Sequence, residues 1–257
     1  MTTLFRIAID GPAASGKSTT AKRLARLLGF RYIDSGAMFR AVTLKSIEQG
    51  LNPETQSEKI GQLATTLDIQ FPEMGQVIVN GKDVTQQLRQ ESVSRVIGPI
   101  ASNPQVRNVL AQLQRTMAST IDQRYDGFLF QQQRNDKEYE KRIHGVVMDG
   151  RDIGTVILPQ AELKIFLIAD AKARAQRRFQ ELQQNKTTNN STVSNSLSFD
   201  QILKDLEARD LADITRTIAP LKKADDAIEV DNSHISIDQQ VQHIQQLVYQ
   251  KLNNINF

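Results

Sequence analysis

The sequence predicts an α/β fold, in which helices cover both faces of a parallel sheet. Two observations predict it: short apolar, β-branched runs with the length of buried strands, and stretches of helical periodicity between them. Strands that alternate with helices in this way form parallel sheets. The strand candidates are Leu4–Asp10, a weaker run at Arg31–Ile33, Val146–Asp149, Leu163–Ala169 and Ala227–Asp231. The helix candidates are Lys17–Leu28, Arg107–Ser119, Lys172–Leu182 and Ile237–Leu252.

Composition and charge limit the classes of protein. The chain has 257 residues, 39% of them hydrophobic, and can bury one large core. Its net charge is only +3, and aromatic residues make up 5% with no Trp, which argues against a nucleic-acid-binding platform. The absence of cysteine excludes disulfides and thiol nucleophiles. Without a signal peptide or an 18-residue apolar run, we expect a cytoplasmic protein with no membrane span.

Three stretches depart from the alternation of strands and helices. Between about residues 36 and 100, Leu67–Phe71 and Gln76–Asn80 read as strands of a small antiparallel sheet, which predicts an α+β insertion. The segment Asp122–Ile143 is rich in Gln, Arg, Lys and Glu and indicates no chemistry. Gln183–Ser198 is almost entirely Gln, Asn, Thr and Ser, and we expect a flexible loop.

A glycine-rich motif follows the first predicted strand. Gly11-Pro12-Ala13-Ala14-Ser15-Gly16-Lys17-Ser18 fits the pattern G-x-x-x-x-G-K-[ST] without a mismatch. Its glycines let the backbone turn tightly and bring N–H groups to phosphate oxygens, and the following helix directs its positive dipole end at the same anion. Lys17 supplies a charge for the β- and γ-phosphates, and the Ser18 hydroxyl is a candidate Mg²⁺ ligand. This phosphate-binding loop (P-loop) predicts a nucleotide-binding protein.

Two charged segments directly follow predicted strands, where ligands of open α/β sheets bind. Ser35 begins a helix after the second strand, with Arg40 five residues further on; an ordinary helix cap and a surface Arg would look the same. After the strand that ends at Asp149, a glycine turn carries Arg151 and Asp152. An Arg at that place can bridge two phosphates with its planar fork, although a simple turn would also explain the glycines.

A third charged segment lies near the end of the chain. Arg209, Asp213 and Arg216 are spaced i, i+4 and i+7, so a helix places them on one face. Alone, this spacing would equally suit a solvated row of ion pairs. Together the three segments add four arginines to a phosphate site, which favours phosphoryl transfer. GTPases are disfavoured because the chain has no D-x-x-G, and Asn185-Lys186-Thr187-Thr188 lacks the final Asp of N-K-x-D.

These motifs, in this order, resemble the bacterial cytidylate kinases, a family of nucleoside monophosphate kinases. The resemblance runs through most of the chain, except Asp122–Ile143 and the polar loop. Its stretches are Ile9–Pro12 into Lys17, Asp34-Ser35-Gly36, Asn103-Pro104-Gln105-Val106-Arg107, Asp149–Thr155, Lys164–Leu167, and Arg209…Asp213…Arg216…Ala219-Pro220-Leu221.

The resemblance implies a P-loop fold with a five-stranded parallel core, a monophosphate-binding insertion and a lid. The expected ranges are 1–35, 101–174 and 211–257 for the core, 36–100 for the insertion and 175–210 for the lid. It implies transfer of the γ-phosphoryl group of ATP, with Mg²⁺, to CMP and dCMP. We expect a monomer that binds no nucleic acid or membrane. A kinase for another acceptor such as UMP, or a non-catalytic nucleotide-binding module, is the alternative.

The resemblance also assigns roles to individual residues. Lys17, Arg151, Arg209 and Arg216 would be catalytic. ATP would be bound by Gly11, Pro12, Ala13, Ala14, Ser15, Gly16, Lys17, Ser18, Thr19 and Arg174, with Arg177 and Arg178 as looser candidates. The monophosphate would be bound by Ser35, Arg40, Arg107, Asp152, Arg209, Asp213 and Arg216: Arg107 and Asp152 read the cytosine edge, and Arg209 with Asp213 holds the ribose.

One departure from the family concerns base selection. The family often has a Ser nine residues before the cytosine-reading Arg, and this chain has Gly98 there, followed by Pro99. The lost hydroxyl should weaken the discrimination of CMP from UMP.

Overall fold

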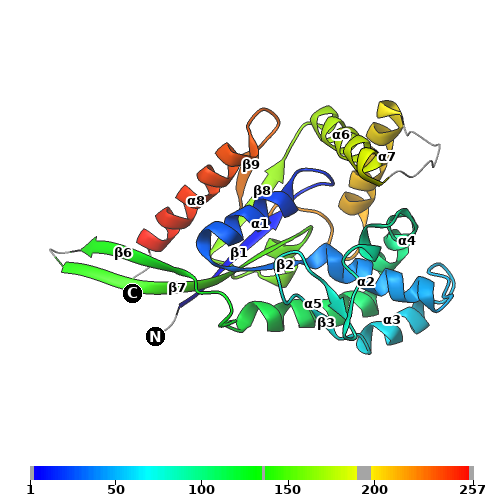
Figure 1. The fold of residues 1–257 in the computed structure, drawn as a ribbon, viewed down its shortest axis with the longest axis horizontal. Helices are drawn as coiled ribbons and strands as arrows, with labels where there is room; N and C mark the ends of the chain where they lie inside the picture. Colours follow the sequence, from blue (N-terminus) through cyan, green and yellow to red (C-terminus); the bar gives the residue numbers. More distant parts are fainter. Residues whose placement is uncertain (1–2, 135–136, 190–197, 255–257) are drawn as a thin grey trace.

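The computed structural model describes residues 3–134, 137–189 and 198–254. Its centre is a twisted sheet in the order β2-β7-β1-β8-β9, in which all neighbouring strands are parallel (Figure 1). The five strands predicted from apolar runs are therefore confirmed, including the weak second one. Their bounds are β1 Thr3–Asp10, β2 Arg31–Asp34, β7 Lys137–Gly150, β8 Leu163–Ile168 and β9 Ile228–Asp231.

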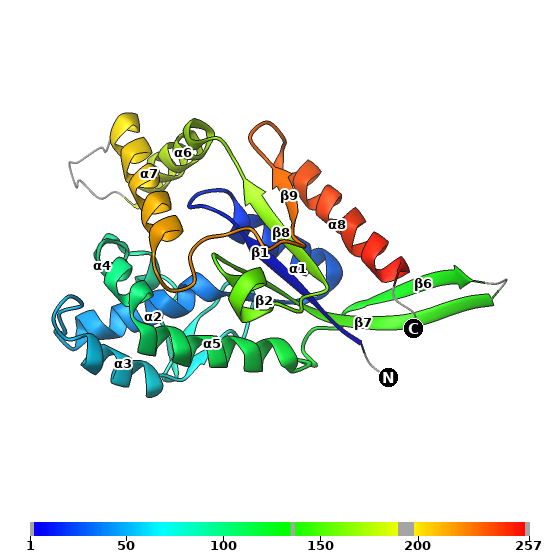
Figure 2. The ribbon, with the colours of Figure 1, turned by 180° about the vertical axis from the view of Figure 1, so that it is seen from behind.

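Helices cover both faces of this sheet (Figures 1 and 2), and alternate residues of β1, β2 and β7 divide between two cores. On one face, Phe5, Ile7 and Ile9 of β1 pack with α1 (Lys17–Leu28) and α8 (Ile237–Asn253). On the other face, Ala8 and strand residues such as Met148 pack with α2 (Ser35–Glu48) and α5 (Pro104–Ser119). The helix predicted at Lys17–Leu28 is confirmed with the same bounds. Helix α5 begins earlier than predicted, because Asn103 caps this helix and Pro104 lies in its first turn.

A second, small sheet lies between α2 and α5. Strands β3 (Ile69–Gln70), β4 (Ile78–Val79) and β5 (Lys82–Asp83) pair antiparallel, as the sequence predicts, and the turn at Asn80-Gly81 joins the last two with positive φ at both residues. The remaining elements of this region are α3 Ser57–Thr65, η1 Gln87–Arg89 and α4 Glu91–Ser102. Helix α4 continues through Gly98 and Pro99.

The segment for which the sequence indicates no chemistry forms a long hairpin. Strand β6 (Phe128–Arg134) pairs antiparallel with the first half of β7, so β7 of the core sheet continues outward as one arm of the hairpin (Figure 2). Phe128 and Phe130 contact the ring of Tyr249 on α8, which fixes the base of the hairpin to the body.

Two helices, α6 (Ala171–Asn189) and α7 (Phe199–Thr215), pack against each other above the carboxyl end of the sheet (Figure 1). The predicted flexible loop at 183–198 is wrong for residues 183–189, because α6 continues through them; residues 190–197 lie outside the described part of the chain. A short helix, η2 (Ile153–Ile157), follows β7. Within the described ranges, no helix is long and apolar enough to cross a membrane.

Candidate active site

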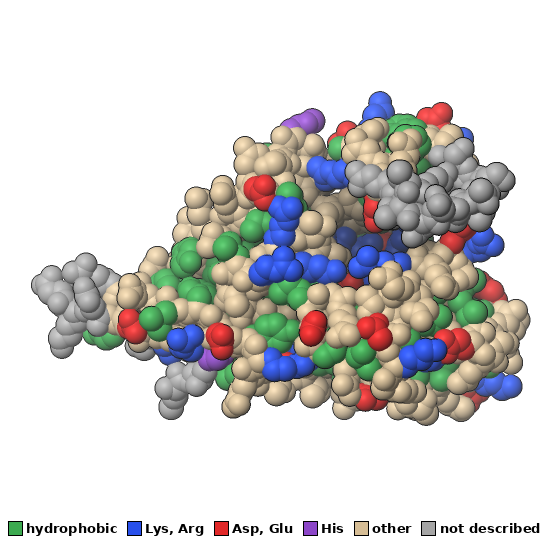
Figure 3. Space-filling model, viewed as in Figure 1, with side chains coloured by type: hydrophobic (Ala, Val, Ile, Leu, Met, Phe, Trp, Pro, Cys, Tyr) green, Lys and Arg blue, Asp and Glu red, His purple; other side chains and the backbone are tan. Residues whose placement is uncertain are grey.

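The charged residues predicted from sequence gather at the carboxyl ends of the parallel strands. Asp10, Asp34 and Asp149 end or nearly end β1, β2 and β7, and the P-loop fills the space between β1 and α1. Figure 3 shows Lys and Arg side chains along a hollow between the α6–α7 part and the rest of the molecule. This is the edge at which open α/β sheets bind ligands.

The backbone conformation of the P-loop depends on its glycines. Gly16 caps α1 with a φ of 84°, in the left-handed region, and a Cβ on Gly11 would lie 2.2 Å from the Leu167 carbonyl oxygen. Lys17 is buried and its Nζ donates to the Pro12 carbonyl at 2.6 Å. Burial, and next the charge of Arg151, hold the pKa of Lys17 well below its ordinary value. A bound phosphate anion would counter both effects.

Ser18, the predicted metal ligand, lies beside a buried carboxylate. Its hydroxyl donates to Asp149 Oδ2 at 2.7 Å, and the Tyr32 hydroxyl donates to Asp149 Oδ1 at 2.7 Å. Burial, and next the charge of Asp34, raise the pKa of Asp149 to about 6. A hydroxyl and a carboxylate next to a phosphate-binding loop are hard oxygen donors, the kind with which Mg²⁺ is held through one or two side chains plus substrate phosphates. These residues fit Mg²⁺.

A second buried carboxylate joins the P-loop strand to the turn that carries Asp152. Asp10 accepts backbone hydrogen bonds from Ile153 (2.9 Å) and Gly154 (2.7 Å). Burial raises the pKa of Asp10 to about 6, although these two hydrogen bonds lower it. The contact fixes the start of η2 relative to β1.

The predicted phosphate-binding arginines lie together and share two carboxylates. Arg151 Nε donates to Asp213 Oδ2 at 2.9 Å, and Arg216 lies 3.6 Å from Asp213 and 3.8 Å from Asp152. Nη2 of Arg216 is buried and has no hydrogen-bond partner among the described residues. Burial, and next the charge of Arg107, lower the pKa of Arg216. The arrangement leaves donors free for an anion.

Arg209 completes this cluster. Its side chain stays accessible to solvent and makes no hydrogen bond or ion pair with another described residue. Partial loss of hydration beside its neighbours, and next the charge of Arg151, lower its pKa. Across the hollow, Arg40 pairs with Asp34 at 3.0 Å, and the Ser35 hydroxyl donates to the Asp149 carbonyl at 2.6 Å. The structure therefore brings Arg40, Arg151, Arg209 and Arg216 to one place.

A small cavity of about 120 Å³ opens beside the cluster. The predicted base-reading residues line it as a buried pair, in which Arg107 Nη2 donates to Asp152 Oδ2 at 2.5 Å. The Arg107 guanidinium also lies 5.4 Å from the ring centre of Phe39. Apolar walls with a few polar groups at one end are typical of small-molecule pockets.

Three side chains make hydrogen bonds to the backbone of the P-loop, and these contacts were not predicted from the sequence. Arg174, predicted to contact ATP, is buried in this structure; it pairs with Asp210 at 2.5 Å and donates to the Ala13 carbonyl at 3.0 Å. Asp210 in turn accepts from the Ala13 N–H at 3.1 Å. Asn232, directly after β9, donates to the Ser15 carbonyl at 2.7 Å and accepts from Arg177 at 3.0 Å. The position of Asn232 directly after a strand was the feature of the sequence from which its role could have been predicted.

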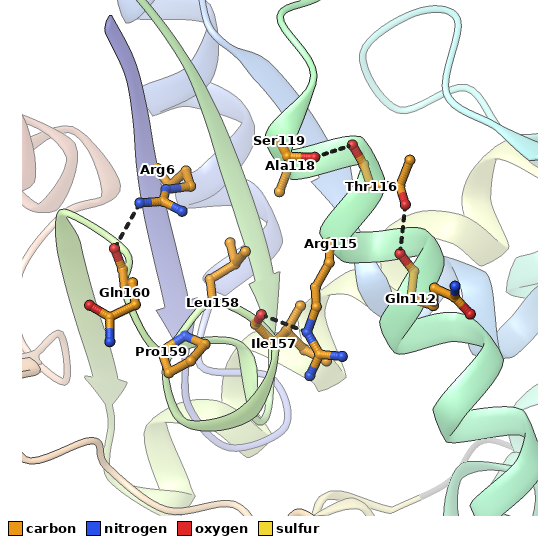
Figure 4. Close-up of a pocket in the computed structure, with 10 residues that line it drawn as sticks. All are labelled: Arg6, Gln112, Arg115, Thr116, Ala118, Ser119, Ile157, Leu158, Pro159 and Gln160. Atoms are coloured by element: carbon orange, nitrogen blue, oxygen red, sulfur yellow. Dashed lines mark hydrogen bonds between the residues drawn. The ribbon is translucent and has the colours of Figure 1, made fainter.

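A second cavity lies elsewhere and differs in chemistry. It measures about 490 Å³ and is lined by residues of β1, α5 and the segment before β8 (Figure 4). Its two arginines are already engaged: Arg6 pairs with Glu162 and donates to the Gln160 carbonyl, and Arg115 donates to the carbonyls of Val156 and Ile157. It adds nothing to the charged cluster.

The fold and this site define a P-loop phosphotransferase, with a phosphate-binding loop facing a ring of arginines and a small second pocket. Comparison with known proteins places it more closely. The cytidylate kinase family model matches residues 7–127 and 129–250, and the chain belongs to this family.

Full-length relatives agree with the family match. The cytidylate kinase of Listeria monocytogenes is 41% identical over 256 residues, which cover 99% of this chain and 100% of the relative. That of Chlorobaculum tepidum is 44% identical over 245 residues, covering 94% and 92%, respectively. That of Pediococcus pentosaceus is 41% identical over 254 residues, covering 96% and 97%.

Proposed function

We propose that this protein transfers the γ-phosphoryl group of ATP to CMP, giving CDP and ADP. The observation that carries the proposal is the convergence of Lys17, Arg151, Arg209 and Arg216, from three distant parts of the chain, beside a P-loop and a second pocket. Binding of one nucleotide would not need this second group of cations. The family membership supports a cytidine nucleotide as the acceptor.

In the proposed reaction, an oxygen of the CMP phosphate attacks the γ-phosphorus in line, and the bond from that phosphorus to the ADP oxygen breaks. Catalysis consists of positioning and charge stabilisation, without a covalent enzyme intermediate. Lys17 and Arg151 meet the charge on the transferred group, and the lowering of the Lys17 pKa by the charge of Arg151 supports their closeness. Arg216, whose Nη2 makes no hydrogen bond with a described residue, and Arg40 bind the CMP phosphate with Ser35.

The remaining assignments follow from the same arrangement. The P-loop residues 11–18 with Thr19 bind the ATP phosphates, and Arg174 supports them through Ala13. Arg107 and Asp152 line the base pocket, and Asp213 with Arg209 holds the ribose. dCMP is proposed as a second acceptor.

Mg²⁺ is the proposed metal, held by the Ser18 hydroxyl with Asp149 beside it. When bound, it would neutralise the charge of the ATP phosphates. The protein's own part is to orient the Ser18 oxygen, which the Tyr32–Asp149–Ser18 hydrogen bonds do.

We propose that residues 36–100 form the monophosphate-binding insertion and 175–210 the lid, with 1–35, 101–174 and 211–257 as the core. The separate small sheet supports the first, and the α6–α7 pair above the P-loop supports the second (Figure 1). Closure of the lid would exclude water from the transfer. We further propose a cytoplasmic monomer.

An acceptor panel tests the proposal. The purified protein is given MgATP with CMP, dCMP, UMP or a small metabolite, and ADP release is measured. We expect ADP release to depend on CMP and to be slow without an acceptor. Strict dependence on a different acceptor would replace CMP in the reaction. Slow ATP hydrolysis that no acceptor accelerates would instead indicate a nucleotide-binding module.

A further inference from the structure

Gln114 is a buried polar side chain without a partner. It lies on α5 and is 2% exposed. Its Oε1 is fully shielded and has no hydrogen-bond partner within the described residues. A buried polar atom left unpaired costs about 1–3 kcal/mol, so such atoms in native proteins call for an explanation.

The position of Gln114 points to a ligand. It lies seven residues after Arg107, two helical turns along the same face of α5, and both residues line the 120 Å³ cavity. The walls between them are apolar and include Val156, Ile157 and Ile218. Six of the eleven lining residues of this cavity are apolar and five are polar or charged, a mixture that suits a flat heterocycle with hydrogen-bonding groups on its edge.

The charged groups of the cavity are already engaged. Arg107 donates to Asp152 at 2.5 Å and to the Ala101 carbonyl at 2.7 Å. The Gln114 amide oxygen has no partner within the described ranges, and rotation of the terminal torsion by 180° presents either the oxygen or the nitrogen. At Gly98, by contrast, no atom lies within 4 Å of where a Cβ would be, and glycine offers no side-chain donor.

We propose that Gln114 contacts the edge of the acceptor nucleotide's pyrimidine base by a hydrogen bond. This inference rests on the proposed function and adds a base-binding residue to it. The base would supply the hydrogen-bond partner that the Gln114 amide lacks in the ligand-free protein. The free-energy cost of the missing hydrogen bond would therefore be removed when the nucleotide binds.

The experiment is a binding series with Gln114→Leu, which removes the amide and keeps the size. Calorimetry measures the affinities for CMP, for ribose 5-phosphate, which lacks the base, and for ADP. We expect the Kd for CMP to rise about tenfold, equivalent to ~1.4 kcal/mol. The affinities for ribose 5-phosphate and ADP should stay within twofold. In turnover, the KM for CMP should rise while kcat changes less than twofold.

Controls separate this role from a structural one. Removal of an unpaired buried amide should leave the Tm unchanged or higher, whereas loss of a structural hydrogen bond would lower it. Gln112→Leu, an exposed position on the same helix, should not change CMP binding. If the Leu variant does not fold, Gln114→Met, unbranched and apolar, replaces it.

Two outcomes overturn the inference. Unchanged CMP affinity in a folded Gln114→Leu or Gln114→Met variant would mean that the Gln114 amide forms hydrogen bonds with water and none with the base. An equal loss for CMP and ribose 5-phosphate would place Gln114 away from the base. Failure of the proposed function is recognised separately, because the parent protein would then bind CMP no better than ribose 5-phosphate.

Discussion

The pair of Arg174 and Asp210 joins α6, α7 and the P-loop, and its removal gives the sharpest test of the structure. The two side chains are 6% and 8% exposed, and their charged atoms lie 2.5 Å apart. Asp210→Ala would leave the guanidinium buried without its counter-charge. Breaking a buried pair from one side costs about 3–5 kcal/mol. For a chain of this size, we expect the Tm to fall by roughly 6–20 °C.

The double variant Arg174→Met/Asp210→Leu should be less damaged than Asp210→Ala alone. Apolar residues of similar volume often replace a buried pair with little loss, because neither charge must then be desolvated. Here the recovery is partial, because the N–H of Ala13 loses its partner Asp210 in both variants, and the carbonyl of Ala13 also loses its partner Arg174 in the double variant. We expect at least half of the lost free energy of unfolding to return.

Urea unfolding of the parent, the single variants Arg174→Met and Asp210→Leu, and the double variant measures the coupling between the two residues. ADP affinity, measured in parallel, should fall in each variant because Ala13 belongs to the P-loop. A loss below about 1 kcal/mol in Asp210→Ala, or losses that simply add in the double variant, would contradict a buried ion pair at this place.

Three further predictions concern single residues. Lys17→Ala should lower kcat/KM by several kcal/mol of transition-state stabilisation, and near-normal turnover in a folded variant would remove Lys17 from the mechanism. Arg151→Lys should lower kcat about 10²–10³-fold, because a point charge cannot replace the fork; an unchanged kcat would make Arg151 structural. Asp10 has a pKa of about 6 when folded, against 3.8 for an ordinary Asp, so the folded state holds its proton more tightly. Its contribution to the free energy of unfolding is therefore full below pH ~4 and falls by about 3 kcal/mol as the pH rises to ~6. Urea unfolding should show this decline in the parent and a shallower one in Asp10→Asn; identical slopes would contradict the shift.

Much of the fold could be predicted because its signals are local. The P-loop helix and the five parallel strands each carry a motif or an apolar run within their own residues. The hairpin could not be predicted in this way. Strand β6 is half glutamine and arginine, and its pairing depends on the partner strand rather than on intrinsic preference. Residues 183–189 were misjudged for a related reason, since Gln and Lys are good helix formers once α6 has started.

The candidate site, like the fold, could be predicted from the sequence only in part. The sequence identified which residues carry charge near the phosphates, but not how they pair. Partners such as Asp152 for Arg107, or Asp213 for Arg151, come from other elements of the fold and are visible only in three dimensions. Asp210 and Asn232 were missed because their functional sign is a contact with the P-loop backbone, and no side-chain motif reports it.

The strand order has a consequence for how the chain is made. Among the residues that the structure describes, β2 pairs only with β7, and β1 pairs with β7 and β8, so neither has a neighbour until residue 150 has left the ribosome. At roughly 5–20 residues per second, translation from β2 to the end of β7 takes on the order of ten seconds. Throughout that time the nascent chain carries two apolar strands with open edges, which are targets for aggregation and for chaperones.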